Sequence, residues 1–189
     1  RCDKEPLDGR TAWHSCQRLC IDKIKSTQDY FRLECHANST INVATLANRL
    51  ATWDREGWIA DVVVIDYADI LAPPIGSSKM DTRDKINETW KQLRRLSQDR
   101  HGLIITATQT KAACYEQTYP LDRRCFSEDK RKMAHVTGMV GINVTSDEKE
   151  KGLMRLNWVV KRDGEYNSRK CIHVAGCLAL ANPCVLSTF

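Results

Sequence analysis

Two carboxylates and a tyrosine follow a short apolar run near the middle of the chain. Residues 62–65 are Val-Val-Val-Ile, Asp66 and Tyr67 come directly after them, and Asp69 lies three residues beyond Asp66. A short run rich in β-branched residues predicts a strand buried on both faces, as in a parallel sheet covered by helices. A buried carboxylate is costly unless it is paired or bound to a metal. Asp66 is therefore a candidate Mg²⁺ ligand at the carboxyl end of a strand, where open α/β sheets bind ligands. The alternative is an ordinary core strand whose Asp caps the next turn.

A second apolar run ends in polar residues further along the chain. Residues 102–109 read Gly-Leu-Ile-Ile-Thr-Ala-Thr-Gln, which predicts another short strand with Gln109 at its end. The apolar run that ends at Asp66 has the pattern of a Walker B element, in which the carboxylate holds Mg²⁺ on a nucleoside triphosphate, usually through water. Because that pattern is common, its meaning depends on the elements that surround it.

Helices are predicted on both sides of the first strand. Asn42 is a predicted N-cap, apolar residues follow it at helical spacing, and Gly57 closes that helix. Asp81 or Asp84 caps a second helix. Alternation at 30–35 predicts a short strand, and the order strand, helix, strand is typical of a βαβ unit. Further predictions are a long loop over 110–128, a helix over 129–135, a strand at 139–144, a hairpin formed by 153–161 and 170–174 with an Asp-Gly turn, and a final strand in the tail.

Length and composition describe one ordinary globular domain. The chain has 189 residues, of which 42% are hydrophobic and 28% charged, so it is long enough to bury a sizeable core. No apolar run reaches the length of a membrane span and the start is not a signal peptide, so we expect no membrane segment and a cytoplasmic location. A net charge of +5 permits contact with nucleic acid but does not argue for it.

Nine cysteines are a high and odd number for a chain of this length. Without a signal peptide we expect reduced thiols. Cys2, Cys16, Cys20 and Cys35 lie in the first part of the chain and are candidate ligands for a structural zinc ion, which needs four such groups in a tetrahedral arrangement. Their spacing fits no standard zinc motif, and partly buried cysteines on a helix are the alternative.

Four stretches occur in an order that matches one protein family. Residues 62–71 read Val-Val-Val-Ile-Asp-Tyr-Ala-Asp-Ile-Leu, 90–97 read Trp-Lys-Gln-Leu-Arg-Arg-Leu-Ser, 104–109 read Ile-Ile-Thr-Ala-Thr-Gln, and 159–164 read Val-Val-Lys-Arg-Asp-Gly. In this order they resemble the Walker B strand, the helix after it, the strand that ends in a phosphate-sensing Gln, and the arginine-finger segment. The family is that of the RecA-like ATPase core of DnaB-type replicative helicases, in particular the phage-encoded ones. The likeness covers about residues 30–176.

The resemblance implies an α/β fold and a division of the chain. We expect a partial RecA-like core, with a mainly parallel sheet flanked by helices and a C-terminal antiparallel hairpin. This ATPase core is expected to occupy residues 30–189, from the Walker B region onward, after a polar Cys-bearing segment over residues 1–29.

The resemblance also implies roles for five residues. Asp66 would organise Mg²⁺ on ATP with Tyr67 in the same nucleotide site, and Gln109 would contact the γ-phosphate. Arg162 would be the arginine finger, which reaches across a subunit interface to stabilise charge on the transferring phosphoryl group. Lys161 would also belong to the nucleotide site, although it is offset by one position from the family's lysine.

Basic residues after Gln109 are candidate contacts to single-stranded DNA. By the resemblance, the loop over 110–128 would face a DNA channel, and surface solubility is the alternative role of its charges. The homo-oligomer implied is a hexameric ring in the cytoplasm of a bacterial or phage-infected cell. The candidate phosphate contacts are Lys111, Arg123, Arg124, Lys130 and Arg131.

One motif of the family does not occur in the sequence. The 189 residues contain no Gly-x-x-x-x-Gly-Lys-[Ser/Thr], the loop that cradles the β- and γ-phosphates in related ATPases. In family order this loop and the catalytic Glu would precede residue 1. We therefore expect the chain to be part of a helicase that couples ATP hydrolysis to translocation on single-stranded DNA, and to be inactive by itself. The alternatives are a degenerate RecA-like module that binds DNA or protein without hydrolysis, and a protein whose zinc-stabilised N-terminal segment mediates protein contacts.

Overall fold

The chain divides into two units in the computed structural model, residues 1–36 and residues 37–189. The structure describes residues 30–126, 130–177 and 182–188, together with residues 10, 11, 14 and 18. Residues 30–36 form no strand, so the strand predicted at 30–35 is wrong. Alternation alone did not make a strand there, because a strand also needs a neighbour that pairs with its backbone. Every element named below belongs to the second unit.

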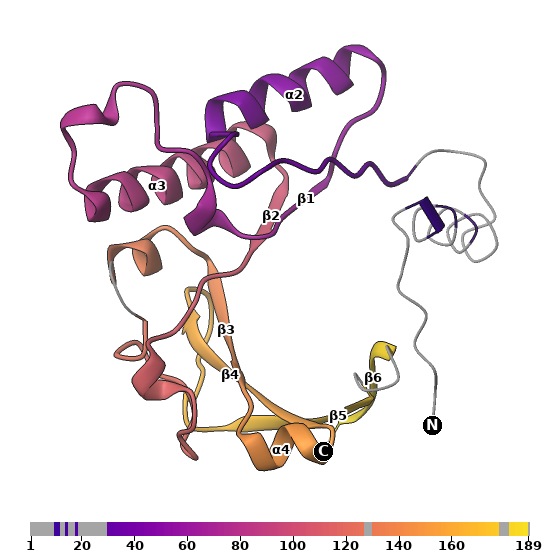
Figure 1. Ribbon diagram of the computed structural model, residues 1–189, viewed down its shortest axis with the longest axis vertical. Helices are drawn as coiled ribbons and strands as arrows, with labels where there is room; N and C mark the ends of the chain where they lie inside the picture. Colours follow the sequence, from indigo (N-terminus) through magenta and orange to yellow (C-terminus); the bar gives the residue numbers. More distant parts are fainter. Residues whose placement is uncertain are drawn as a thin grey trace. The chain divides into compact units, whose positions relative to one another are not determined.

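Two helices flank a pair of parallel strands (Figure 1). Helix α2 spans Val43–Arg55 and α3 spans Thr82–Arg100, while strands β1 and β2 span Val62–Ile65 and Leu103–Thr106. The side chain of Asn42 accepts a hydrogen bond from the backbone N–H of Thr45, and that of Asp81 accepts one from Asp84, which confirms both predicted N-caps. No helix in the described part of the chain is long and apolar enough to cross a membrane.

The two helices cover only one face of the parallel strands. Leu50 of α2 and Leu93 of α3 are buried in a cluster against which Val63, Ile65 and Ile104 pack from the strands. The alternate strand residues point away from this cluster. The expectation that the first strand is buried on both faces is therefore wrong, since the described helices cover one face only. The outward residues are Val62, Val64, Leu103 and Ile105, with exposed fractions of 49%, 71%, 53% and 47%.

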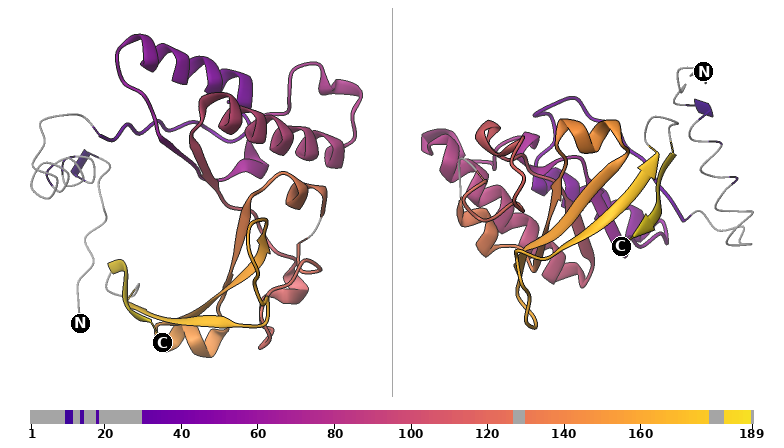
Figure 2. Two further views of the ribbon diagram at one scale, coloured as in Figure 1. Left: turned by 180° about the vertical axis from the view of Figure 1, so that it is seen from behind. Right: turned by 90° about the horizontal axis from the view of Figure 1, so that it is seen from below.

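The C-terminal part forms an antiparallel sheet with the strand order β3-β4-β5-β6 (Figures 1 and 2). These strands span Gly138–Asn143, Leu153–Lys161, Cys171–Cys177 and Asn182–Thr188, and the short helix α4 over Ser146–Glu150 connects β3 to β4. Gly164, with a φ of +81°, lies in the predicted turn between β4 and β5, so the hairpin is confirmed. The α/β class, with flanked parallel strands and a C-terminal antiparallel part, is also confirmed, and the antiparallel part has four strands.

The segment between β2 and β3 is folded onto the antiparallel sheet. A short 3₁₀ helix over Ala112–Cys114 and an antiparallel bridge between Thr110 and Phe126 give it regular structure. Phe126 is buried in a second apolar cluster, which it forms with other residues of this segment and with residues of β3 and β4. Val136 packs against both clusters. The predicted helix over 129–135 is a 3₁₀ helix at Lys130–Ala134. The second cluster consists of Leu121, Cys125, Phe126, Met139, Val159 and Val160.

Candidate functional site

Three of the predicted site residues lie together at the carboxyl ends of β1 and β2. Ile65 and Thr106, the last residues of these parallel strands, are partners in the sheet, so the residues that follow them leave from the same edge. Asp66 and Gln109 are exposed. The Nε2 of Gln109 donates a hydrogen bond of 3.3 Å to the hydroxyl of Tyr67. Strand pairing thus brings Asp66, Tyr67 and Gln109 to one edge.

A threonine at the end of β2 fixes the path of the chain after β1. The Oγ1 of Thr106 donates to the carbonyl of Ile65 at 2.9 Å and accepts from the backbone N–H of Ala68 at 2.8 Å. Ala68 is 1% exposed. Ile65 precedes Asp66 and Tyr67, and Ala68 follows them. Because both flanking residues are hydrogen-bonded to Thr106, the short turn formed by Asp66 and Tyr67 is fixed to β2 at both ends.

A buried polar cluster lies next to this edge. The carboxylate of Asp69 accepts hydrogen bonds from the indole N–H of Trp90 at 2.8 Å and from the hydroxyl of Thr108 at 2.5 Å. The ammonium of Lys132 lies 3.3 Å from the same carboxylate, donates to the Thr108 hydroxyl at 2.5 Å, and lies 5.8 Å from the centre of the Trp90 ring. Lys132 is 3% exposed. Four segments far apart in sequence therefore meet around one buried charge.

This cluster was not predicted from the sequence. Asp69 stands out as the second carboxylate after β1, but Lys132 lies in a basic stretch whose members look alike in sequence. The only sequence signal was the apolar face of α3, which places Trp90 toward the interior.

Arg162 is bound to its own chain rather than to the edge of the parallel strands. Its Nε donates to the carbonyl of Val136 at 2.8 Å, and its Nη2 donates to the carbonyl of Ala134. The Nζ of Lys161 lies 5.9 Å from the centre of the Trp158 ring. Among the contacts of the described residues, none joins Arg162 or Lys161 to the residues at the ends of β1 and β2.

The five basic candidates for DNA contacts differ in their surroundings. All five are exposed. Arg123 donates to the hydroxyl of Tyr166 at 3.3 Å, and Arg131 forms a 2.9 Å ion pair with Asp84 of α3. The guanidinium groups of Arg123 and Arg131 therefore each have a contact within the protein.

Two buried asparagines anchor the segment between β2 and β3. The Oδ1 of Asn143 accepts from the backbone N–H of Leu121 at 2.7 Å, and its Nδ2 donates to the Oδ1 of Asn157 at 2.9 Å. Asn157 in turn donates to the carbonyl of Leu121 at 2.9 Å. Both backbone polar groups of Leu121 are thus satisfied by side chains of the antiparallel sheet, as buried groups require.

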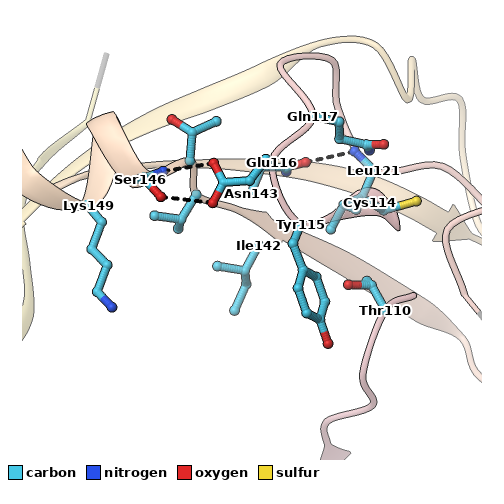
Figure 3. A pocket seen from close by; sticks show the side chains of 12 residues that line it. Thr110, Cys114, Tyr115, Glu116, Gln117, Leu121, Ile142, Asn143, Ser146 and Lys149 are labelled. Atoms are coloured by element: carbon cyan, nitrogen blue, oxygen red, sulfur yellow. Dashed lines mark hydrogen bonds between the residues drawn. The ribbon is translucent and has the colours of Figure 1, made fainter. Parts of the chain in front are cut away.

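A cavity of about 320 Å³ lies between this segment and the start of α4 (Figure 3). On its wall, the carboxylate of Glu116 accepts hydrogen bonds from the backbone N–H and the hydroxyl of Ser146, at 3.1 and 2.9 Å. Tyr115, Ile142 and Lys149 also line the cavity, and in Figure 3 their side chains point the same way. An exposed aromatic ring and a lysine side chain therefore both lie on the wall of this cavity.

The described cysteines show no metal centre. Cys35 is exposed, while Cys2, Cys16 and Cys20 lie outside the described residues. No group of three or more His, Cys, Asp and Glu side chains in the described part of the chain could hold a metal ion. The zinc site therefore stays a prediction.

The carboxylate of Asp66 fits the requirements of Mg²⁺ at a nucleotide. It is exposed at the strand end, and no side-chain partner within the described residues occupies it. Mg²⁺ keeps several waters and is bound through one or two carboxylates together with substrate phosphates. A single unpartnered carboxylate at this edge meets that description.

Comparisons with known proteins identify the family and the fold. A model of the family "Divergent DnaB-like ATPase" matches residues 9–118, more than half of the chain, including β1, α3 and β2. The fold is similar to an ATPase domain of known structure, with a TM-score of 0.63 and 14% identity, over 75% of this chain and 50% of that one. It is also similar to a DnaB-like replicative helicase, from a structure describing its interactions with primase, with a TM-score of 0.60 and 13% identity, over 72% of this chain and 34% of that one.

The similarity has a limited extent. This chain spans half of the first structure and about a third of the second. The comparison with curated protein sequences gave no match. The family match includes both strand ends at which Asp66 and Gln109 lie, and it covers more than half of the residues. The chain belongs to the divergent DnaB-like ATPase family.

Proposed function

We propose that this chain is part of a DnaB-like motor in which ATP hydrolysis drives movement along single-stranded DNA. The observation that carries the proposal is the meeting of Asp66, Tyr67 and Gln109 at the ends of two paired parallel strands, within the region matched by the family. The ends of such strands are where α/β sheets bind ligands. The proposed assembly is a ring of identical subunits.

In this proposal Asp66 holds Mg²⁺ through water and Gln109 responds to the γ-phosphate. Bound Mg²⁺ supplies charge that neutralises the phosphates during transfer. Gln109 reaches the phosphate by exchanging its 3.3 Å hydrogen bond to Tyr67 for one to a phosphate oxygen. Because Lys111 follows two residues later, a shift of Gln109 moves the start of the basic segment that is proposed to contact DNA.

Two further features belong to the proposal. Arg162 serves a neighbouring subunit only after it releases the carbonyls of Ala134 and Val136, so the finger is formed on assembly. The 189 residues contain no Gly-x-x-x-x-Gly-Lys-[Ser/Thr] loop, so in the proposed motor the phosphate-binding loop comes from residues outside this sequence.

The test is ATP hydrolysis by the full natural protein that contains this chain, with and without single-stranded DNA. We expect Asp66→Asn to lower kcat about 100-fold, since it removes charge stabilisation that acts in the transition state. Asp61→Asn is the matched control, because Asp61 is an exposed carboxylate just before the opposite end of the same strand. Equal rates for wild type and Asp66→Asn would exclude the proposed role of Asp66.

The hydrogen-bonded position of the Arg162 side chain favours a second function. Its hydrogen bonds to the carbonyls of Ala134 and Val136 suit a degenerate module that binds DNA without hydrolysis. Such a module would bind single-stranded DNA with an affinity that falls with salt and ignores Mg-ATP. Absent hydrolysis together with this binding behaviour would select the second function over the first.

A further inference from the structure

Lys132 carries a charge in a place where charges are rarely found. Its side chain is 3% exposed, and the Asp69 side chain, its ionic partner, is 19% exposed. Removing two charges from water costs more than a close ion pair returns in many proteins, and well-packed apolar residues often do as well. Stability alone therefore does not account for a lysine here.

The partners of Lys132 are close in sequence to two of the proposed site residues. Asp69 follows Asp66 by three residues, and Thr108 directly precedes Gln109. The Lys132 ammonium contacts both partners, at 3.3 Å from the Asp69 carboxylate and 2.5 Å from the Thr108 hydroxyl. One charge thus touches the two chain segments that leave the parallel strands.

The other side of Lys132 leads to Arg162. The 3₁₀ helix Lys130–Ala134 contains Lys132, and the carbonyl of Ala134 accepts a hydrogen bond from Arg162. The backbone N–H of Arg162 also donates to the carbonyl of Thr137 at 3.0 Å. A displacement of Lys132 would therefore be transmitted through the short stretch to Val136, whose carbonyl and that of Ala134 accept the hydrogen bonds of Arg162.

The geometry also defines which way Thr108 points. Its hydroxyl donates to Asp69 and accepts from Lys132, so both of its hydrogen-bonding roles are fixed by this pair. An apolar side chain in place of Lys132 would fill the space, but it would leave the hydroxyl without its donor. The consequence falls on the next residue, Gln109.

We propose that Lys132 is a positioning residue that fixes the position of Gln109 relative to Asp66. It also connects both residues to the backbone carbonyls that hold Arg162. It acts through Thr108 and Asp69 and touches no substrate. This inference rests on the proposed function, because it assigns Gln109 the sensing role. When Gln109 exchanges its hydrogen bond to Tyr67 for one to a phosphate, four side chains respond as one hydrogen-bonded unit. These are Lys132, Asp69, Thr108 and Trp90.

The first test reads the position of Gln109 directly. Side-chain amide and indole N–H signals of Gln109 and Trp90 are recorded by ¹⁵N NMR in the full chain, for wild type, Lys132→Met and Lys91→Met. Lys91 is an exposed lysine on α3 and serves as the matched control. We expect both signals to shift in Lys132→Met and neither in Lys91→Met. A Gln109 signal that stays in place in Lys132→Met overturns the proposal.

The second test separates positioning from stability. Lys132→Met leaves the Asp69 carboxylate without its counter-charge, so its stability is expected to fall, whereas Asp69→Asn with Lys132→Met removes both charges and recovers stability. We expect DNA-stimulated kcat of the full natural protein to stay about 10- to 100-fold low in the double variant, with KM for ATP changed less than about 2-fold, since a misplaced group affects the reacting geometry. Recovery of kcat together with stability overturns the proposal.

The two tests distinguish this inference from the proposed function. A wild-type protein without ATP hydrolysis contradicts the proposed function, while the Gln109 signal still reports whether Lys132 positions it. Hydrolysis by wild type with an unchanged kcat in Lys132→Met contradicts the inference alone. Thr108→Val provides a milder variant that keeps the shape of the side chain and removes the hydroxyl, and we expect it to shift the Gln109 signal in the same direction as Lys132→Met.

Discussion

Two thiols at the base of the segment between β2 and β3 share a hydrogen bond. Cys125 is 3% exposed and Cys114 packs against the same apolar cluster. The hydrogen bond that the Cys114 thiol donates to Cys125 is the main cause that raises the pKa of Cys114 to about 11, and burial and the nearby Asp122 act in the same direction. Since only the thiolate is nucleophilic, Cys114 is expected to be inert at neutral pH despite being partly exposed.

This pKa predicts the alkylation of Cys114. At pH 8 about one thiol in 1,000 would be ionised, against about one in four for an ordinary cysteine with a pKa near 8.5. We expect iodoacetamide to label Cys114 slowly at pH 8 and faster up to about pH 11, as measured by site-resolved mass spectrometry of the native protein. Cys125→Ala removes the hydrogen bond and is expected to speed labelling at pH 8. Labelling of Cys114 at the rate of the unfolded chain would contradict the prediction.

At the scale of elements, the short helix α4 is held by one ion pair. Glu148 completes a capping box with Thr145, and its carboxylate accepts from the Nε and Nη2 of Arg155 at 2.6 and 3.2 Å. Arg155 also donates to the carbonyl of Thr118. The hydrogen bonds from Arg155 hold the pKa of Glu148 below the usual glutamate range, although burial opposes them. Helix, strand and the segment before β3 therefore depend on one guanidinium group.

The lowered pKa of Glu148 gives a pH dependence of stability. The stabilisation is fully present above the ordinary glutamate pKa, about 4.3, and is lost as the pH falls through the lower value of the folded state. We expect Glu148→Gln to reduce the free energy of unfolding by about 1–3 kcal/mol at pH 7, the range of hydrogen bonds to charged groups. This difference should shrink as urea unfolding is followed downward from pH 5. Glu150→Gln, on the exposed side of the same helix, is the control and should have little effect at any pH.

Local chemistry decided which elements could be predicted from the sequence. The caps at Asn42 and Asp81 and the Asp-Gly turn are set by neighbouring residues, so they were predictable. The folding of the segment between β2 and β3 was not, because its anchor at Leu121 depends on Asn143, 22 residues away. The apolar run of β1 likewise predicts a buried strand, but it does not tell whether helices cover one face of the strand or both. In the described part of the chain they cover one face.

The residues of the candidate site likewise fall into those that the sequence predicts and those that it does not. Asp66 and Gln109 each end an apolar run, and the pairing of parallel strands brings such ends together. Lys132 could not be distinguished from the exposed basic residues beside it, since its burial depends on Asp69 and Thr108, which lie 63 and 24 residues away. The role of Arg162 was implied by the resemblance of residues 159–164 to the family's segment, and its hydrogen bonds to the carbonyls of Ala134 and Val136 could not be inferred from that resemblance.

At the scale of the whole molecule, a net charge of +5 is too small to identify a DNA-binding protein by itself. The arrangement of the charges is more informative. Lys111, Arg124 and Lys130 are exposed on one segment and its continuation, whereas on α3 Lys91 and Arg95 lie within 3.4 Å of the carboxylates of Glu88 and Asp99. Charge on the first group is more available to phosphates than charge on the second.

The salt dependence of DNA binding tests this difference in charge. Each phosphate neutralised by a side chain contributes about 0.7 to the slope of log K against log salt on single strands. We expect Lys111→Gln and Arg124→Gln each to reduce that slope by about 0.7 on a single-stranded oligonucleotide, measured by fluorescence anisotropy of the full natural protein at several salt concentrations. Lys91→Gln removes the same charge from α3 and should leave the slope unchanged, because its ammonium is already paired with Glu88. Equal slopes for all three variants would mean that DNA responds only to net charge, and the segment after β2 would then have no special place in binding.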